Sequence, residues 1–217
     1  MARIDDYKES FRLAALELKK SNLTDLAKAS EVDIAASDNG VVGLKLSFLG
    51  TPIIVQVGES VDVVRDGQEG EVPLPEKILI CHYLLHATGK PATGELITFR
   101  QIPDGHFYFD AFQRRARDPF LATFGKDADL FRTCAQRLGG FPVETGDVGM
   151  AFQVFPRIAL QIVLWEGDEE FEPEASILFD SAIQNELAVE DIAVVSGMVV
   201  YRLMGIARGL QAAALFK

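Results

Sequence analysis

The sequence has few cysteines, no excess of basic side chains and no long uninterrupted apolar run. Two cysteines in 217 residues exclude a disulfide framework and cannot supply the four ligands of an iron–sulfur cluster within this chain alone. The formal net charge of −11 disfavours nucleic acid and anionic membranes as partners. The charged N-terminus has no apolar signal segment, and Arg202 and Arg208 interrupt the apolar stretch 192–216. We therefore expect a cytoplasmic protein without a membrane span.

Several catalytic signatures are also missing. The sequence contains no phosphate-binding Gly-rich loop, no dinucleotide-binding Gly-x-Gly-x-x-Gly, no Gly-x-Ser-x-Gly elbow and no Cys-x-x-Cys pair. Each of these motifs supplies a backbone shape or a reactive group that its chemistry requires. The common nucleotide-dependent, serine-nucleophile and dithiol chemistries therefore lose most of their support.

Hydrophobic periodicity predicts a mixture of helices and strands. Apolar spacings of three and four residues indicate helices, and β-branched runs bounded by glycine and proline indicate strands. Because these elements cluster instead of alternating, we expect an α+β fold, with an antiparallel sheet packed against several helices in a single compact domain, 1–217. The expected elements are an N-terminal helix over 4–20, a strand meander over 31–64, a helical middle over 75–138, and strands with a long C-terminal helix over 147–217.

The negative charge is concentrated in residues 166–191, which hold ten acidic side chains and no lysine or arginine. This acidic segment is either a solvated loop and helix start, or a docking surface for a basic partner. A third interpretation is a site for a hard cation or a cationic ligand beside Trp165, because the carboxylates of Glu166, Asp168, Glu169 and Glu170 are the oxygen ligands that calcium or magnesium prefers.

Three arginines are predicted to lie on largely apolar elements. Arg115 shares a helical face with Tyr108 and Phe112 at ideal helix spacing. Because burying an unpaired guanidinium is costly, Arg115 needs either a carboxylate from the acidic segment or a bound anion. We expect Arg100, Arg115 and Arg157 to hold carboxylates of a ligand.

The histidine pair is the third candidate feature. His82 and His86 lie one turn apart on an apolar predicted helix, where they are either core residues or ligands of a metal or tetrapyrrole. Tyr83 occupies the position at which a zinc protease would carry its catalytic glutamate, so that type of hydrolysis is not supported. Trp165 and Glu166 are predicted to form a wall of the same ligand site.

Six segments are characteristic when taken together: PLPEKILICHYLLH (73–86), TGELITFR (93–100), FPR (155–157), LWEGDEEF (164–171), ILFD (177–180) and ED (190–191). They resemble a family of prokaryotic proteins without an assigned activity. Members of that family often follow a four-cysteine iron–sulfur module like that of corrinoid iron–sulfur proteins, and many occur in anaerobes. The resemblance implies a setting in anaerobic redox or one-carbon metabolism and an iron–sulfur or corrinoid protein as partner. This chain lacks the cysteine module.

Three functional hypotheses follow. The leading one is a soluble small-ligand-binding module that holds a corrinoid, another tetrapyrrole or a divalent metal, with His82 and His86 as ligands. The second is an interaction or regulatory partner that docks through the acidic segment and loses association when Glu169 and Glu170 become lysine. The third is a metal-dependent enzyme that uses the carboxylates of residues 168–170 with histidine as the base.

Overall fold

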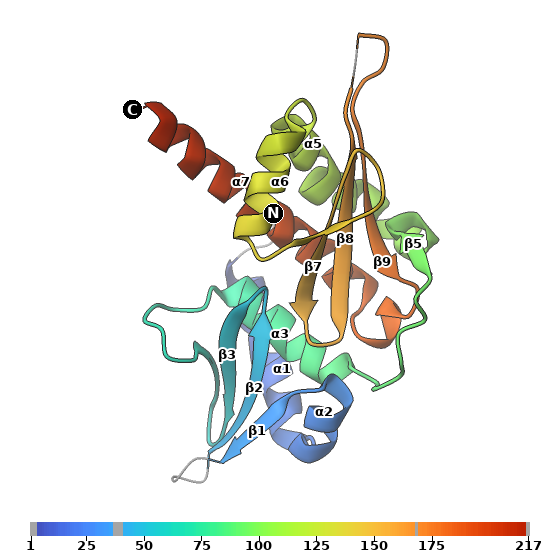
Figure 1. Ribbon diagram of the computed structural model, residues 1–217. Coiled ribbons are helices and arrows are strands. Elements are labelled where there is room, and N and C mark those ends of the chain that lie inside the picture. The colour runs from blue at the N-terminus through green and yellow to red at the C-terminus, as the bar shows by residue number, and fades with distance from the viewer. Residues whose placement is uncertain (1–3, 37–40, 168, 216–217) are drawn as a thin grey trace. The chain divides into compact units, whose positions relative to one another are not determined.

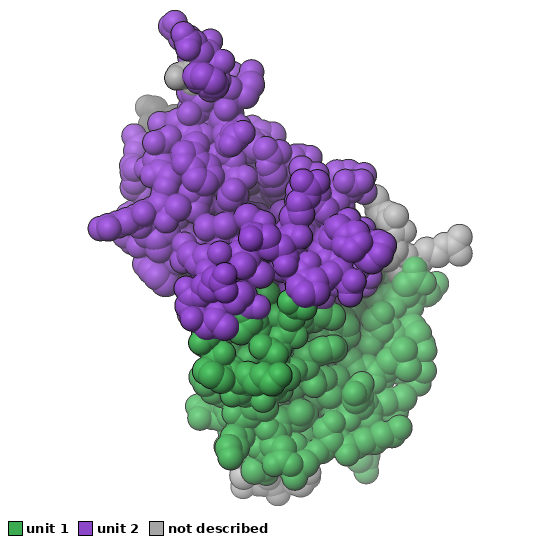
Figure 2. Space-filling view, turned by 90° about the vertical axis from the view of Figure 1, so that its right-hand side faces the viewer, with its two compact units in different colours: residues 1–92, 155–157, 182–188 green, residues 93–154, 158–181, 189–217 purple. Residues whose placement is uncertain are grey.

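The computed structural model describes residues 4–36, 41–167 and 169–215. Its contacts divide the chain into two compact units, each with its own sheet and helices (Figures 1 and 2). Unit 1 comprises residues 1–92, 155–157 and 182–188, and unit 2 comprises residues 93–154, 158–181 and 189–217. The α+β class, with antiparallel sheets packed against helices, is confirmed, while the single domain 1–217 stays a prediction.

Unit 1 is built on a four-stranded sheet whose strands follow one another in sequence order. The strands are β1 (Asp33–Ala36), β2 (Val42–Phe48), β3 (Thr51–Val57) and β4 (Val61–Arg65), with every neighbouring pair antiparallel. The helices are α1 (Ile4–Lys20), α2 (Leu23–Ser30) and α3 (Leu74–His86), followed later in the chain by the short helix η3 (Ile183–Asn185). Helix α3 is apolar on most sides and contacts both α1 and α2, so it forms the core of this unit.

Unit 2 contains a sheet with strand order β5-β9-β8-β7-β6. The strands are β5 (Leu96–Thr98), β6 (Phe141–Val143), β7 (Val148–Phe155), β8 (Ile158–Trp165) and β9 (Glu174–Asp180). The helices are η1 (Phe99–Gln101), α4 (Gly105–Phe112), η2 (Gln113–Arg117), α5 (Asp118–Phe124), α6 (Ala128–Arg137) and α7 (Val189–Leu215). Buried phenylalanines from the sheet and helices fill the space between them.

Most elements agree with the sequence-based expectations. The N-terminal helix has the predicted bounds, the described residues of the region 31–64 form an antiparallel meander, and the last described element is a helix of 27 residues. Although α7 is long and largely apolar, no helix in the described part of the chain meets the length and hydropathy needed to cross a bilayer.

The expected helical middle over 75–138 contains a π-helical turn. Residues 113–117, between α4 and α5, are π-helical, with one more residue in the hydrogen-bonded turn than an α-helix has. This segment packs on α7, where a Cβ on Gly197 would lie 3.1 Å from the Arg115 carbonyl oxygen. The absence of a side chain at Gly197 therefore permits this close helix contact.

Two glycine substitutions in α7 test this interpretation. Gly205→Ala adds a methyl group that meets no atom within 4 Å beyond the adjacent backbone of its own helix, and we expect it to stabilise the protein by about 1 kcal/mol through helix propensity. Gly197→Ala brings the same propensity gain but forces the π-helical backbone to move, so we expect it to be at least about 1 kcal/mol less favourable than Gly205→Ala. Urea unfolding of both variants measures the difference, and equal effects would contradict the packing argument.

Candidate functional site

The residues predicted to bind a ligand fall in different units. His82, His86 and Arg157 belong to unit 1, whereas the other four belong to unit 2: Arg100, Arg115, Trp165 and Glu166. Each unit presents its own arrangement of polar side chains. The common ligand cavity expected from the sequence stays a prediction.

The two histidines lie on one stripe of α3. His82 is half-buried and His86 is exposed, and their ring centroids are 6.4 Å apart. The neighbouring Cys81 is buried, and burial raises the pKa of its thiol to about 12. Because a protonated thiol is a poor metal ligand, the imidazoles are the metal-binding groups that this end of α3 offers.

The predicted metal ligands are also divided between the units. The histidines belong to unit 1, whereas Glu169 and Glu170 are exposed in unit 2, and Asp168 lies outside the described residues. Among the residues that the structure describes, no group of three or more His, Cys, Asp or Glu side chains is arranged to hold a metal ion. Metal binding and metal-dependent catalysis stay predictions.

Arg157 has the most extensive contacts of the predicted residues. It follows β7, and its side chain is 10% exposed. Its Nε donates a hydrogen bond to Glu186 Oε1 at 3.0 Å. Its two terminal nitrogens donate to a carboxylate oxygen of Glu31 and to the carbonyl oxygen of Lys90. The carboxylate partners that a guanidinium needs when buried are thus supplied by the chain itself.

Tyr83 forms a hydrogen bond with the backbone of Arg157, in the turn that follows β7. Its hydroxyl donates to the carbonyl oxygen of Ser30 at 2.6 Å and accepts a hydrogen bond from the Arg157 backbone N–H at 3.3 Å. The Tyr83 ring stacks on Phe155, with centroids 4.3 Å apart. Burial raises the pKa of the phenol, so the hydroxyl keeps its proton and serves as the donor to Ser30.

Glu186 is the acidic partner that the sequence did not single out. Its side chain is 5% exposed, and its Oε2 is buried without a hydrogen-bond partner among the described residues. Burial raises the pKa of this carboxyl group, and the hydrogen bond and charge of Arg157 oppose the effect. As one of ten acidic residues in the segment 166–191, Glu186 carried no pattern that marked it as buried.

The two arginines of unit 2 that were predicted to bind a ligand lie at the surface. The guanidinium carbon of Arg100 is 4.6 Å from the centroid of the Phe109 ring, a cation–π geometry. Arg115 was expected on an apolar face with Phe112, but Phe112 is buried and Arg115 is exposed. The π-helical turn changes the angular spacing between these positions, so Arg115 does not require the buried carboxylate inferred for it.

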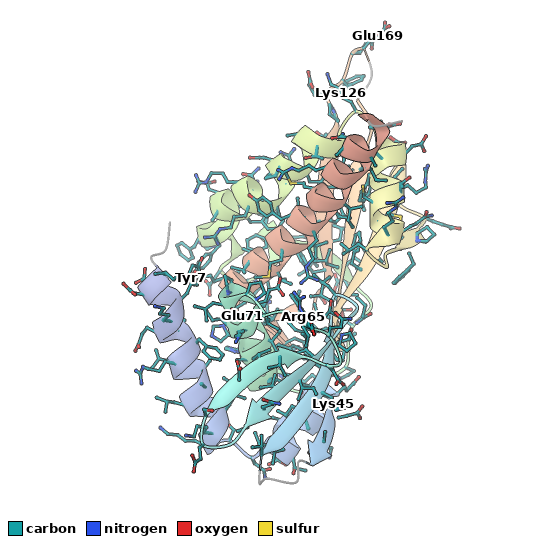
Figure 3. The ribbon with its side chains drawn as sticks, turned by 90° about the vertical axis from the view of Figure 1, so that its left-hand side faces the viewer. Tyr7, Lys45, Arg65, Glu71, Lys126 and Glu169 are labelled. Carbon is teal, nitrogen blue, oxygen red and sulfur yellow. The ribbon has the colours of Figure 1, made fainter. Side chains whose placement is uncertain are left out.

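Trp165 and Glu166 lie at the end of β8, where the chain leaves the sheet. The described residues 165–167 and 169–174 form a projection that we term the acidic tip (Figure 1), with Glu169 near its far end (Figure 3). Glu166 has an internal role, because its carboxylate accepts a hydrogen bond from the backbone N–H of Ala128 at 3.1 Å. Glu166 thus caps α6, a contact across 38 residues of sequence.

Each unit also has a hollow at its surface. In unit 2, a hollow of about 330 Å³ lies beside the start of α6 and is lined by Lys126, Asp127, Ala128, Asp129, Arg132, Asp147, Val148 and Glu166. In unit 1, a hollow of about 290 Å³ is lined by Glu31, Asp33, Lys45, Leu46, Ser47, Pro52, Ile53, Asp66 and Pro156. Glu31 is shared between the unit 1 hollow and the Arg157 contacts.

Replacing Glu186 by glutamine removes the buried charge and keeps an oxygen for Arg157. The pKa of the Glu186 carboxyl group is higher in the folded protein than in the unfolded chain. Ionisation of this group therefore destabilises the folded protein at pH values above the folded-state pKa. This destabilisation disappears as the pH falls to the unfolded-state pKa. We expect the melting-temperature difference, variant minus wild type, to be more positive at about pH 7.5 than at about pH 4. Thermal melts measure it, with exposed Glu69→Gln as control. A difference that does not vary with pH would refute the assignment.

Comparisons with known proteins give a family but no activity. No curated protein and no solved structure matches the chain. Residues 22–202 match the family described as a domain of unknown function (DUF3786). The match covers most of the chain, including the acidic tip and the three residues that accept hydrogen bonds from the Arg157 side chain. This protein therefore belongs to the DUF3786 family, whose function is not assigned.

Proposed function

We propose that the protein is an interaction module that docks onto a basic surface of a partner protein through the acidic tip. The observation that carries this proposal is the exposure of two aromatic side chains on an acidic projection: Trp165 is 38% exposed and Phe171 is 70% exposed. The acidic side chains around them are all exposed: Glu166, Glu169, Glu170, Glu172 and Glu174.

This combination resembles the composition of protein interfaces. Aromatic side chains provide large apolar area at little cost in side-chain entropy and are enriched among the residues that dominate binding energy. Like charges around them steer a partner of opposite charge and reject partners of the same charge. The complementary surface is an apolar pocket surrounded by lysine and arginine.

The base of the acidic tip is tightly packed. A Cβ on Gly167 would lie 2.6 Å from Pro173 Cδ, and a Cβ on Gly125 would lie 2.9 Å from Pro173 Cγ. Pro173 thus fits between two glycines, one of them at the end of α5. A projection held at its base loses less entropy on binding than a free loop does.

The family resemblance supports a partner class and a setting. Relatives that carry a four-cysteine module in the same chain would keep this domain next to an iron–sulfur cluster. We therefore propose an iron–sulfur or corrinoid protein of cytoplasmic anaerobic redox or one-carbon metabolism as the partner.

Charge reversal at the acidic tip tests this function. The wild-type chain and the variant Glu169→Lys with Glu172→Lys are used to capture proteins from a source extract, and each captured protein is purified and titrated. Phe171→Ser is titrated in parallel. We expect affinity to fall at least about tenfold in either variant, and wild-type binding to weaken with added salt.

The matched control reverses charge elsewhere in unit 2. Glu95 and Glu144 are exposed, so Glu95→Lys with Glu144→Lys changes the net charge equally and is expected to leave binding intact. Equal loss in the control would show that total charge, and not the acidic tip, determines association. Salt-insensitive binding unaffected by Phe171→Ser would refute the proposal.

A second candidate function is binding of a corrinoid, another tetrapyrrole or a divalent metal by the histidine pair. It is favoured by the partial exposure of His82 and His86 on one stripe of α3. Two imidazoles one helical turn apart can bind one metal ion together. Alternatively, one imidazole can be the axial ligand of a tetrapyrrole metal while the other forms a hydrogen bond.

Reconstitution distinguishes this second candidate. Purified protein is mixed separately with cobalamin, haem, Zn²⁺ and Co²⁺, and absorption spectra and melting temperatures are recorded. We expect at least one to change the spectrum or raise the melting temperature, and expect His82→Ala with His86→Ala to abolish that response. No response, or one unchanged in the double variant, would refute histidine ligation.

A further inference from the structure

One surface of unit 2 combines arginines with an exposed aromatic ring. It lies on η1, α4 and η2, and the contacts of α4 with both other segments join them into one surface. We term it the basic face and define it by five residues: Arg100, His106, Phe107, Arg114 and Arg115. All five side chains are exposed, and Phe107 is 74% exposed. Neither proposed function uses this face.

The π-helical turn brings two of these arginines to the surface. Phe112 and Ala116 are buried, and the wider turn between them leaves the consecutive residues Arg114 and Arg115 both exposed. Such π-helical turns are frequently found at functional sites. This turn therefore presents two neighbouring guanidinium groups on one side of the helical segment 105–117.

Aromatic rings accompany the positive charge. The guanidinium carbon of Arg100 is 4.6 Å from the centroid of the Phe109 ring, and the ring centroids of His106 and Phe107 are 3.9 Å apart. Arginine and aromatic side chains are enriched among the residues that dominate binding energy in protein interfaces. The basic face thus offers an apolar contact and cationic groups together.

The charge of this face is opposite in sign to that of the whole chain. Residues 99–117 contain four arginines and two acidic residues, Asp104 and Asp110. Among the residues that the structure describes, no ion pair involves the three arginines of the basic face. Because the formal net charge of the chain is −11, this local excess of positive charge favours an acidic partner.

The acidic tip has the complementary composition. Its exposed glutamates oppose the arginines in charge, and it carries exposed rings of its own, Trp165 and Phe171. The tip extends beyond the sheet of unit 2 (Figure 1). Phe171 is 70% exposed and Phe107 is 74% exposed, so the tip and the basic face do not cover each other within one chain. A second copy of the chain can bring them together.

We propose that the acidic tip of one copy docks onto the basic face of a second copy. Glutamates of the tip pair with Arg114 and Arg115, and Phe171 packs against Phe107. Because the contact joins two different surfaces, it forms chains or closed rings of copies. A narrow projection buries little area, so the association is weak and depends on protein concentration.

This inference rests on the proposed function, because it uses the acidic tip as an interaction surface, and it names a further partner for that tip. A tip seated on a second copy is closed to any other protein. Self-association therefore competes with docking onto a foreign basic surface.

Sedimentation equilibrium of the full chain tests self-association. We expect the weight-average mass to rise above that of one chain between about 10 μM and about 1 mM protein. We expect it to return to that of one chain in about 0.5 M NaCl, because salt screens exposed charges. A mass equal to one chain at every concentration in low salt would overturn the proposal.

Two variants, each changed on one surface, test the pairing. Glu169→Lys with Glu172→Lys changes the tip, and Phe107→Ser with Arg114→Ala changes the basic face. We expect each variant alone to stay monomeric, with circular dichroism confirming that it folds. In an equimolar mixture, the intact face of the first variant can bind the intact tip of the second, so we expect a heterodimer and no larger species. Absence of association in this mixture would contradict pairing of the tip with the face.

The matched control removes the same residue types elsewhere in unit 2. Phe141 and Arg137 are exposed, and Phe141 lies on β6, at the edge of the sheet opposite β5. We expect Phe141→Ser with Arg137→Ala to self-associate like the wild-type chain. Equal loss of association in this control would refute the assignment of the basic face.

Capture of foreign proteins separates this inference from the proposed function. The basic-face variant keeps an intact tip, so we expect it to bind a captured partner at least as tightly as the wild-type chain does. A chain that stays monomeric but binds a foreign protein through its tip would overturn self-docking alone. Self-association that needs both surfaces, without a foreign partner for the tip, would overturn the proposed function alone.

Discussion

The architecture of unit 1 depends on the buried ion pair between Arg157 and Glu186. A buried pair contributes little net stability because desolvation offsets the attraction, but removing one partner leaves an uncompensated charge. Its geometric role is larger here, because one guanidinium connects the turn after β7, the segment that follows η3, the loop after α3 and the end of α2. Glu31 reaches it from a left-handed backbone conformation with φ of 55°.

The acidic segment 166–191 combines side chains with different physical roles. Glu166 caps a helix through the N–H of Ala128, and the carboxylate of Asp180 accepts hydrogen bonds from the backbone N–H groups of Thr93 and Gly94. Glu186 neutralises Arg157 inside unit 1, whereas Glu169 is exposed on the acidic tip. The sequence around these acidic residues is similar, so it does not show which of them form internal contacts and which are exposed at the surface.

Helices and strands could be predicted from the sequence because hydrophobic periodicity and turn residues are signals that span only a few neighbouring positions. The helix over residues 4–20, the strand meander and the α+β class all follow from such patterns. The orientation of Arg115 was wrong because one π-helical turn changes the angular spacing of every later position. Glu186 and Glu31 were missed because their contacts with Arg157 join residues 29 and 126 positions apart. Asp168 lies outside the described residues.

The way the chain passes between the two units has a consequence for biosynthesis. Residues 155–157 and 182–188 belong to unit 1, although the segments around them belong to unit 2. A ribosome that has released the first ninety or so residues has therefore not yet supplied Arg157 or Glu186, and Tyr83 waits for its stacking partner Phe155. Unit 1 reaches its final packing only after residues 182–188 have been made, and no single division of the chain separates the two units intact.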